Sequence, residues 1–197
     1  VNLSRGNYFV LPLLGFLIGL IWHIHIALLP ALIAIPAAIF VSRKVPDIKN
    51  TLKFIAVLLI SSTPLLVFEI KHGFIQILSL INNFTAGHNS STGMEKLNLV
   101  LGMVSKNINS LFFAPHAHFL ANNFFITLIL FLSILIFLIR KKIVLLKEII
   151  PQVVWILGVI LFFSASSSPI SEYYFANIEI IFLSLVALFL YFLYTSS

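Results

Sequence analysis

Residues 122–142 read NNFFITLILFLSILIFLIRKK, and this stretch decides the fold class. From Phe124 to Ile139 it contains no charged side chain, and the basic residues Arg140, Lys141 and Lys142 follow at once. An apolar run of about 20 residues is what an α-helix needs to cross a bilayer, and basic residues commonly mark the end of such a run. The stretch therefore predicts a membrane-spanning helix over residues 122–139.

The composition extends this prediction to the whole chain. Of its 197 residues, 60% are hydrophobic and 9% are charged, and the mean hydropathy is +1.12. A soluble domain is nearer half apolar and one quarter charged, so lipid must cover part of this apolar surface. With spans of about 20 residues, the chain has room for roughly six crossings. We expect an all-α fold, a polytopic transmembrane helix bundle of about six spans that forms a single transmembrane domain over residues 1–197.

The first apolar stretch, residues 8–41, is too long for one span and long enough for two. A tight re-entrant pair of helices that turns near His23 and His25 fits it best. One long tilted helix, broken near Pro30, is the alternative, and it would reverse the orientation of Arg5. The remaining predicted spans lie over residues 52–68, 149–163 and 175–194.

A long polar connection separates the third and fourth predicted spans. Apolar and polar residues alternate at helical spacing over 74–82, as in an amphipathic helix on a membrane surface. A Ser/Thr/Asn-rich loop over 85–92 follows, and a second amphipathic segment over 95–113 leads back to the membrane. Asn122 and Asn123 are suited to cap the helix after them.

Basic residues set the predicted orientation. The net charge of +6 resides mostly in two short loops, 42–53 and 140–148. Both are cytoplasmic by the positive-inside rule, and the two spans between them place them on the same side, as that rule requires. The connection over 70–121 then faces outward. We expect an integral protein of a bacterial or archaeal plasma membrane that contacts membrane lipid.

The composition and motifs exclude several functions. The basic excess lies in membrane-flanking loops and no basic-aromatic groove is present, so no nucleic acid partner is expected. The chain has no cysteine, which excludes disulfides and thiol chemistry. No glycine-rich nucleotide motif occurs, and His116 and His118 lack an acidic or cysteine partner nearby. We therefore expect no cofactor and no metal.

Ionisable groups at the membrane surface are the candidate functional residues. Lys71 and His72 could bind a phosphate at headgroup level, with Glu69 orienting one of them. Alternatively they anchor the end of a helix, which the sequence alone favours. The candidates on the predicted outer side are His23, His25, Glu69, Lys71, His72, His88, His116, His118, Glu172, Tyr173 and Tyr174.

The string over residues 63–74, TPLLVFEIKHGF, resembles a segment of bacterial membrane glycosyltransferases of the GT-C type. This group is related to protein O-mannosyltransferases and the aminoarabinose transferase of lipid A (glycosyltransferase family 39-like). Its helices often end in Pro, a few apolar residues and Phe-Asp/Glu-Leu/Ile-Arg/Lys-His. Gly19-Leu20 followed by His25 resembles a second run of that group, in which His23 replaces the usual Gln. A weaker third match is Tyr173-Tyr174-Phe175.

The resemblance implies transfer of a sugar from a polyprenyl-phosphate donor to an acceptor at the outer membrane face. It assigns His25, Glu69, Lys71 and His72 to positions near the donor phosphate or the active cavity. The family carries its catalytic carboxylate in a first outer loop that this sequence lacks. We therefore expect a central to C-terminal fragment, inactive alone, whose catalytic base lies outside it. The alternative function is a transporter or flippase subunit, although the ionisable groups lie at span ends and not at mid-membrane.

Overall fold

The stretch that opens the sequence analysis forms helix α7 (Phe124–Arg140) in the computed structural model, which describes residues 2–24, 26–85, 93–111, 123–167 and 170–196. Asn123 caps it: the side-chain oxygen accepts hydrogen bonds from the backbone N–H groups of Phe125 and Ile126, at 3.0 and 3.4 Å. This satisfies donors that an α-helix leaves free at its start. The predicted helix and its Asn123 cap are confirmed, whereas Asn122 lies outside the described residues.

The fold is all-α over the described ranges, which contain no strand, so the predicted fold class is confirmed there. Four 3₁₀ segments accompany the α-helices: η1 (Leu3–Arg5), η2 (Tyr8–Val10), η3 (Ile26–Ile33) and η4 (Glu172–Phe175). Besides α7, the α-helices are α1 (Leu11–Ile24), α2 (Ala34–Ser42), α3 (Ile48–Lys71), α4 (Ile75–Thr85), α5 (Met94–Ser110), α8 (Leu146–Ala165) and α9 (Ala176–Ser196).

Three helical segments of the described chain are long and apolar enough to cross a membrane: Ile48–Lys71, Leu146–Ala165 and Glu172–Ser196. Three apolar helices are shorter: Tyr8–Ile21, Leu28–Ser42 and Phe124–Arg140. With 17 residues at about 1.5 Å each, α7 is only about 26 Å long, slightly less than a hydrocarbon core of about 30 Å. The structure therefore supports a membrane protein with three full-length candidate spans, and it does not fix the predicted number of six.

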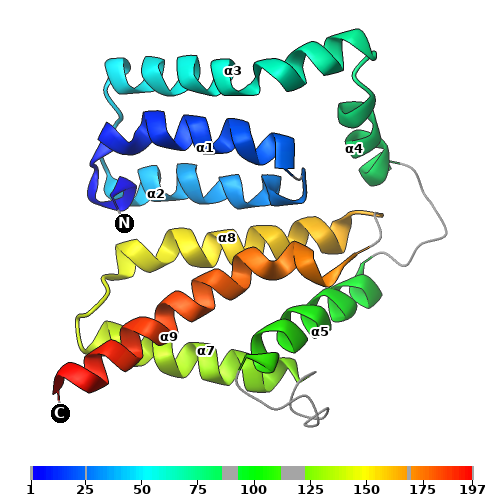
Figure 1. Cartoon of the computed structure of the whole chain (residues 1–197). Coiled ribbons are helices and arrows are strands. Elements are labelled where there is room, and N and C mark those ends of the chain that lie inside the picture. Colours follow the sequence, from blue (N-terminus) through cyan, green and yellow to red (C-terminus); the bar gives the residue numbers. More distant parts are fainter. Residues whose placement is uncertain (1, 25, 86–92, 112–122, 168–169, 197) are drawn as a thin grey trace.

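The first apolar stretch folds as a hairpin. Helix α1 runs in one direction and η3 with α2 returns beside it in the other (Figure 1). The chain therefore reverses its direction between α1 and η3, as the re-entrant pair predicts, and the single long tilted helix is wrong. Pro30 lies inside η3. An α-helix at this position would lack one backbone hydrogen bond, because proline has no N–H group.

Two glycines bring α1 against α3. A side-chain Cβ at Gly15 would lie 2.5 Å from the Phe54 carbonyl oxygen, and a Cβ at Gly19 would lie 1.9 Å from the Ser61 hydroxyl oxygen. Glycines four residues apart lie on one helix face and let two backbones approach closely, as in many membrane helix pairs. Such contact matters here because only 6% of the apolar window of α3 is buried within the molecule.

The hairpin joins the rest of the molecule through α8, against which α2, η3 and η1 pack (Figure 1). The guanidinium of Arg5 forms an ion pair with Glu148, whose side chain is 5% exposed, at 2.6 Å. Beyond α8, a core of apolar side chains from α5, α7, α8 and α9 includes Val104, Leu138 and Phe182. The hairpin with α3 thus forms one layer and the C-terminal helices form the other.

Both basic loops lie at the same end of the molecule (Figure 1). Residues 43–47 join α2 to α3 there, and residues 141–145 join α7 to α8. The predicted orientation requires the two spans between these loops to bring the chain back to the same side. The position of both loops at one end of the molecule agrees with this requirement. The opposite end carries the α3–α4 corner, α5 and η4.

The glycine contact gives a test by single substitution. We expect Gly15→Ala to lower the free energy of unfolding by about 1–3 kcal/mol, because the added methyl group meets a backbone oxygen that cannot rotate away. The matched control is Gly102→Ala in α5, whose Cβ would meet nothing within 4 Å. That variant should be neutral or gain up to about 1 kcal/mol from helix propensity. Reversible unfolding in mixed micelles measures both, and equal stability of the two variants would contradict the close contact.

Candidate functional site

Glu69 is buried at the corner between α3 and α4, with 1% of the residue exposed. One carboxylate oxygen accepts a long hydrogen bond of 3.5 Å from the backbone N–H of Ile77, and the other is buried and has no partner among the described residues. Gly73 and Phe74 both have positive φ, of 68° and 61°, and turn the chain so that α4 begins beside the carboxylate. A carboxylate at a helix N-terminus is favoured by the helix dipole.

Lys71 and His72 lie next to Glu69 in sequence but do not join its carboxylate. Both are exposed. The His72 ring stacks on Phe68 with 4.1 Å between ring centroids, and its Nδ1 lies 2.8 Å from the Phe68 carbonyl oxygen. His72 is therefore held against its own helix, an arrangement that fits helix anchoring and leaves Lys71 open to a ligand at the membrane surface.

The remaining histidine candidates cannot be placed beside these residues. His25, His88, His116 and His118 lie outside the described residues, and so does the side chain of His23. Helices α1 and α3 end at the same end of the molecule (Figure 1). Among the residues that the structure describes, no group of three or more His, Cys, Asp or Glu side chains could hold a metal ion.

Helix α5 lies across the ends of α7, α8 and α9 and carries a buried lysine (Figure 1). Lys96 is 4% exposed, and its ammonium group donates a hydrogen bond to the Ser166 carbonyl oxygen just beyond α8. Burial lowers the pKa of Lys96 below its ordinary value of 10.5, because the charged form loses its hydration. A lysine with a perturbed pKa beside a helix end is a candidate functional group.

Further buried polar side chains accompany Lys96. Ser105 and Asn109 on α5 are fully buried, and Asn177 in the first turn of α9 is 8% exposed. Both side-chain polar atoms of Asn177 are buried without a hydrogen-bond partner in the described part of the chain. A buried amide left unsatisfied costs free energy, so such a group requires an explanation, and binding of a polar ligand is one.

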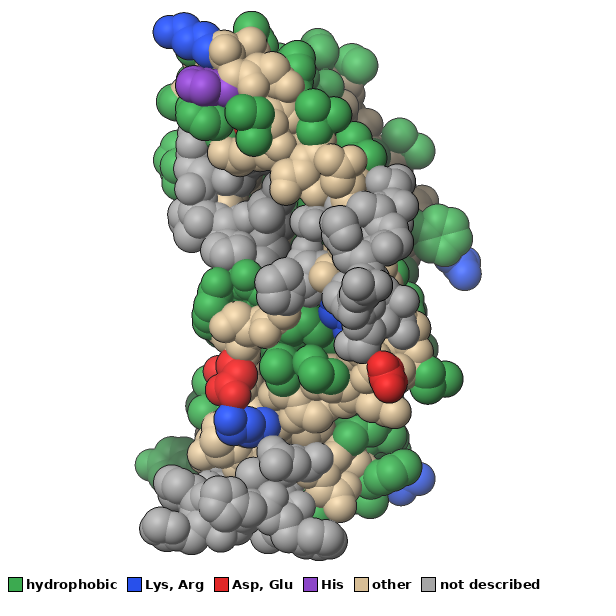
Figure 2. All heavy atoms as spheres, turned by 90° about the vertical axis from the view of Figure 1, so that its right-hand side faces the viewer, with side chains coloured by type: hydrophobic (Ala, Val, Ile, Leu, Met, Phe, Trp, Pro, Cys, Tyr) green, Lys and Arg blue, Asp and Glu red, His purple; other side chains and the backbone are tan. Residues whose placement is uncertain are grey.

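Exposed contacts fasten α5 to η4. The Lys106 ammonium and the Glu172 carboxylate form an ion pair at 2.5 Å, and the Asn107 amide donates to the Glu172 carbonyl oxygen at 2.8 Å. Figure 2 shows this end of the molecule, on which charged side chains are few and hydrophobic ones lie between them. An exposed ion pair of this kind adds little stability, so its main effect is to fix where η4 lies relative to α5.

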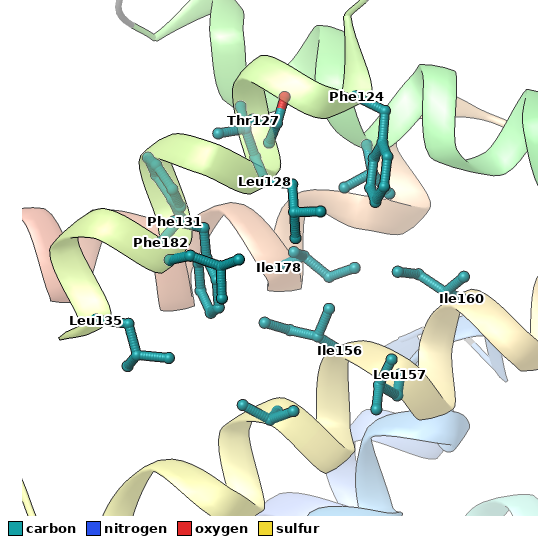
Figure 3. A pocket seen from close by; sticks show the side chains of 14 residues that line it. Phe124, Thr127, Leu128, Phe131, Leu135, Ile156, Leu157, Ile160, Ile178 and Phe182 are labelled. Atoms are coloured by element: carbon teal, nitrogen blue, oxygen red, sulfur yellow. The ribbon is translucent and has the colours of Figure 1, made fainter.

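An apolar groove of about 420 Å³ lies beneath α5, between α7, α8 and α9 (Figure 3). Of the described lining residues, Thr127 alone is polar, and its hydroxyl donates a hydrogen bond to the Asn123 carbonyl oxygen at 3.3 Å. The groove therefore offers carbon surface alone, which suits a hydrocarbon chain. The lining residues are Val104, Ile108, Phe124, Thr127, Leu128, Phe131, Leu132, Leu135, Val153, Ile156, Leu157, Ile160, Ile178 and Phe182.

Sequence reasoning did not single out Lys96, Asn177 or the groove. A signal for Lys96 was present, because it precedes the buried residues Val100, Val104 and Ile108 at steps of four and so belongs to the apolar face of α5. The groove had no such signal, since it combines residues from four helices that are far apart in sequence.

Comparison of the chain with protein-family models, with curated proteins and with solved structures finds no match.

The buried lysine predicts a dependence of stability on pH. Because its pKa is lower in the folded than in the unfolded chain, the folded state binds fewer protons between the two values. The stability of the protein relative to Lys96→Met should therefore increase as the pH rises toward 10.5. Unfolding in detergent at a series of pH values measures this difference, with Lys106→Met as the control for loss of a positive charge from α5. A difference independent of pH would contradict the burial of a charged lysine.

Proposed function

We propose that the chain is part of a GT-C type membrane glycosyltransferase, which transfers a sugar from a polyprenyl-phosphate donor to an acceptor at the outer face of the membrane. The apolar groove is the observation that carries the proposal. Two of its lining residues, Val104 and Ile108, come from α5, the helix that also bears the buried Lys96. A hydrocarbon-binding surface next to buried polar groups suits an amphiphilic, lipid-linked substrate.

In this proposal the six apolar helical segments are all spans, with the three shorter ones lying where the bilayer is locally thinned. The basic loops 42–53 and 140–148 face the cytoplasm, and the α3–α4 corner, α5 and η4 face outward. The polyprenyl chain lies in the groove between α7, α8 and α9. This orientation puts the polar groups at headgroup level, where a lipid-linked phosphate would be.

Lys71 and His72 are the residues that we assign to the donor phosphate. Both are exposed at the end of α3, where a phosphate at the membrane surface can reach them. Lysine side chains commonly bind phosphate. Glu69 has the opposite character: its buried carboxylate could not accept a proton from an acceptor hydroxyl without first becoming exposed. We therefore assign Glu69 to holding the α3–α4 corner and not to proton transfer.

Sugar transfer in membranes that contain the protein at its natural length, supplied with a mixed pool of polyprenyl-phosphate sugars, tests the proposal. We expect Lys71→Ala and His72→Ala to lower transfer at least about tenfold, the effect of losing one charge-assisted hydrogen bond. Leu128→Trp should raise KM for the donor by filling the groove. Its control is Ile129→Trp, on the same helix but outside the groove and 63% exposed.

The outcomes separate the interpretations. If the Lys71→Ala and His72→Ala variants still transfer sugar, these residues only anchor the end of the helix. The proposed enzyme class is then unaffected. Transfer unaffected by Leu128→Trp removes the groove from donor binding. If no donor supports transfer, the glycosyltransferase proposal fails, and a lipid-flipping assay on the same membranes then tests the transporter or flippase alternative.

A further inference from the structure

We propose that a groove at the basic end of the molecule binds the headgroup of an anionic phospholipid. The groove lies between the end of α2 and the start of α8 and has a volume of about 860 Å³. It is a different site from the apolar groove beneath α5, and the inference does not depend on the proposed glycosyltransferase function. Its lining residues are Ile39, Phe40, Val41, Arg43, Lys44, Val45, Pro46, Leu146, Lys147 and Ile150.

Three cationic side chains from two distant parts of the sequence meet at this groove. Arg43 and Lys44 follow α2, whereas Lys147 stands in the first turn of α8. Among the residues that the structure describes, no acidic side chain lines the groove. Like charges brought together repel one another, so a site of this composition favours a bound anion.

Hydrogen bonds fix the backbone that carries two of these cations. The Lys44 carbonyl oxygen accepts a hydrogen bond from the Tyr8 hydroxyl at 2.5 Å, and the Lys44 N–H donates to the Ser42 hydroxyl at 3.1 Å. Lys44 also lays its aliphatic carbons over Gly6, where a Cβ would come within 2.5 Å of them. Arg43 ends α2 with a φ of 55°. The backbone at Arg43 and Lys44 is thus held in place before any ligand arrives, which lowers the entropic cost of binding.

The nearest carboxylates are already engaged. Glu148 follows Lys147 in sequence but is buried, pairs with Arg5 at 2.6 Å, and lines a neighbouring cavity with Gln152 and Trp155. Asp47 accepts hydrogen bonds from the backbone and side chain of Asn50, at 3.1 and 2.8 Å. The structure shows no ion pair of Arg43, Lys44 or Lys147 within its described ranges. The positive charge at the groove is therefore available to an external anion.

Apolar side chains at the groove favour a lipid over a free anion. Phe40 is 85% exposed, Val45 is 90% exposed and Leu146 is 61% exposed. These residues would pack against acyl chains while the cations bind the phosphate. Basic pockets between membrane helices on the cytoplasmic side are suited to anionic headgroups, and this end is cytoplasmic by the positive-inside rule.

Native mass spectrometry on the full chain, released from mixed micelles, tests the inference. It compares how much phosphatidylglycerol and how much phosphatidylcholine the protein retains. We expect the triple variant Arg43→Gln, Lys44→Gln, Lys147→Gln to bind phosphatidylglycerol about 100-fold more weakly, and Lys147→Gln alone about fivefold more weakly. The single variant keeps the test valid if the triple variant does not fold. The control carries the same change of charge at the same end, Lys49→Gln, Lys53→Gln, Lys142→Gln, and none of these lysines lines the groove.

Unchanged binding by the control together with the expected losses supports the site. Equal losses in both triple variants would overturn it, because attraction by the overall positive charge would then explain the binding. Unchanged retention by the groove variants would overturn it as well. Displacement of the lipid by millimolar inorganic phosphate would show a free-anion site, and the lipid assignment would fail.

Discussion

Lipid cannot hydrogen-bond to a peptide group, and this constraint shapes the whole molecule. A chain with this apolar content satisfies its backbone inside helices, and almost every described residue outside a turn is helical. Once the helices exist, burying apolar side chains against each other adds little, because lipid tails accept them equally well. Many large apolar side chains therefore stay uncovered, such as Phe40 at 85%, Ile60 at 73% and Phe125 at 72% exposure. What joins the helices is close backbone approach, as at Gly15 and Gly19, together with a few polar contacts at their ends.

The polar contacts occupy the two ends of the bundle and differ in kind. At the basic end, Arg5 and Glu148 connect the start of the chain to α8, and three other cations remain open beside them. At the opposite end, polar side chains are buried: Glu69 under the α3–α4 corner, and Lys96 and Asn177 where α5 crosses the other helices. An open cationic groove suits an anionic headgroup, whereas the buried side-chain atoms of Glu69 and Asn177 that have no partner in the described part of the chain suit a polar ligand. The two ends of the bundle therefore differ in the burial of their polar groups as well as in their charge.

The sequence predicts the helices well because uninterrupted apolar runs have one structural solution in a membrane. The hairpin over residues 8–41, α7 and the Asn123 cap all follow from such local signals. Helix limits are less predictable: α3 extends beyond the predicted residues 52–68 to Ile48–Lys71, because Asp47 caps it and its polar ends continue the helical hydrogen bonds. Side-chain placement is harder still. Glu69 and Lys71 are two residues apart on α3 and so point to opposite sides of the helix, where only Glu69 is buried. The groove lined by Arg43, Lys44 and Lys147 depends on tertiary packing.

The ion pair between Arg5 and Glu148 joins residues separated by 143 positions. During synthesis, the N-terminal helices emerge and enter the bilayer well before α8 exists. Until then Arg5 has no buried carboxylate to meet, and the α1–α3 contact is the main restraint on the early helices. The bond from Lys96 to Ser166 closes across 70 positions and also waits for the end of α8. The order of synthesis therefore makes residues of the α1–α3 contact available before either of these long-range contacts can form.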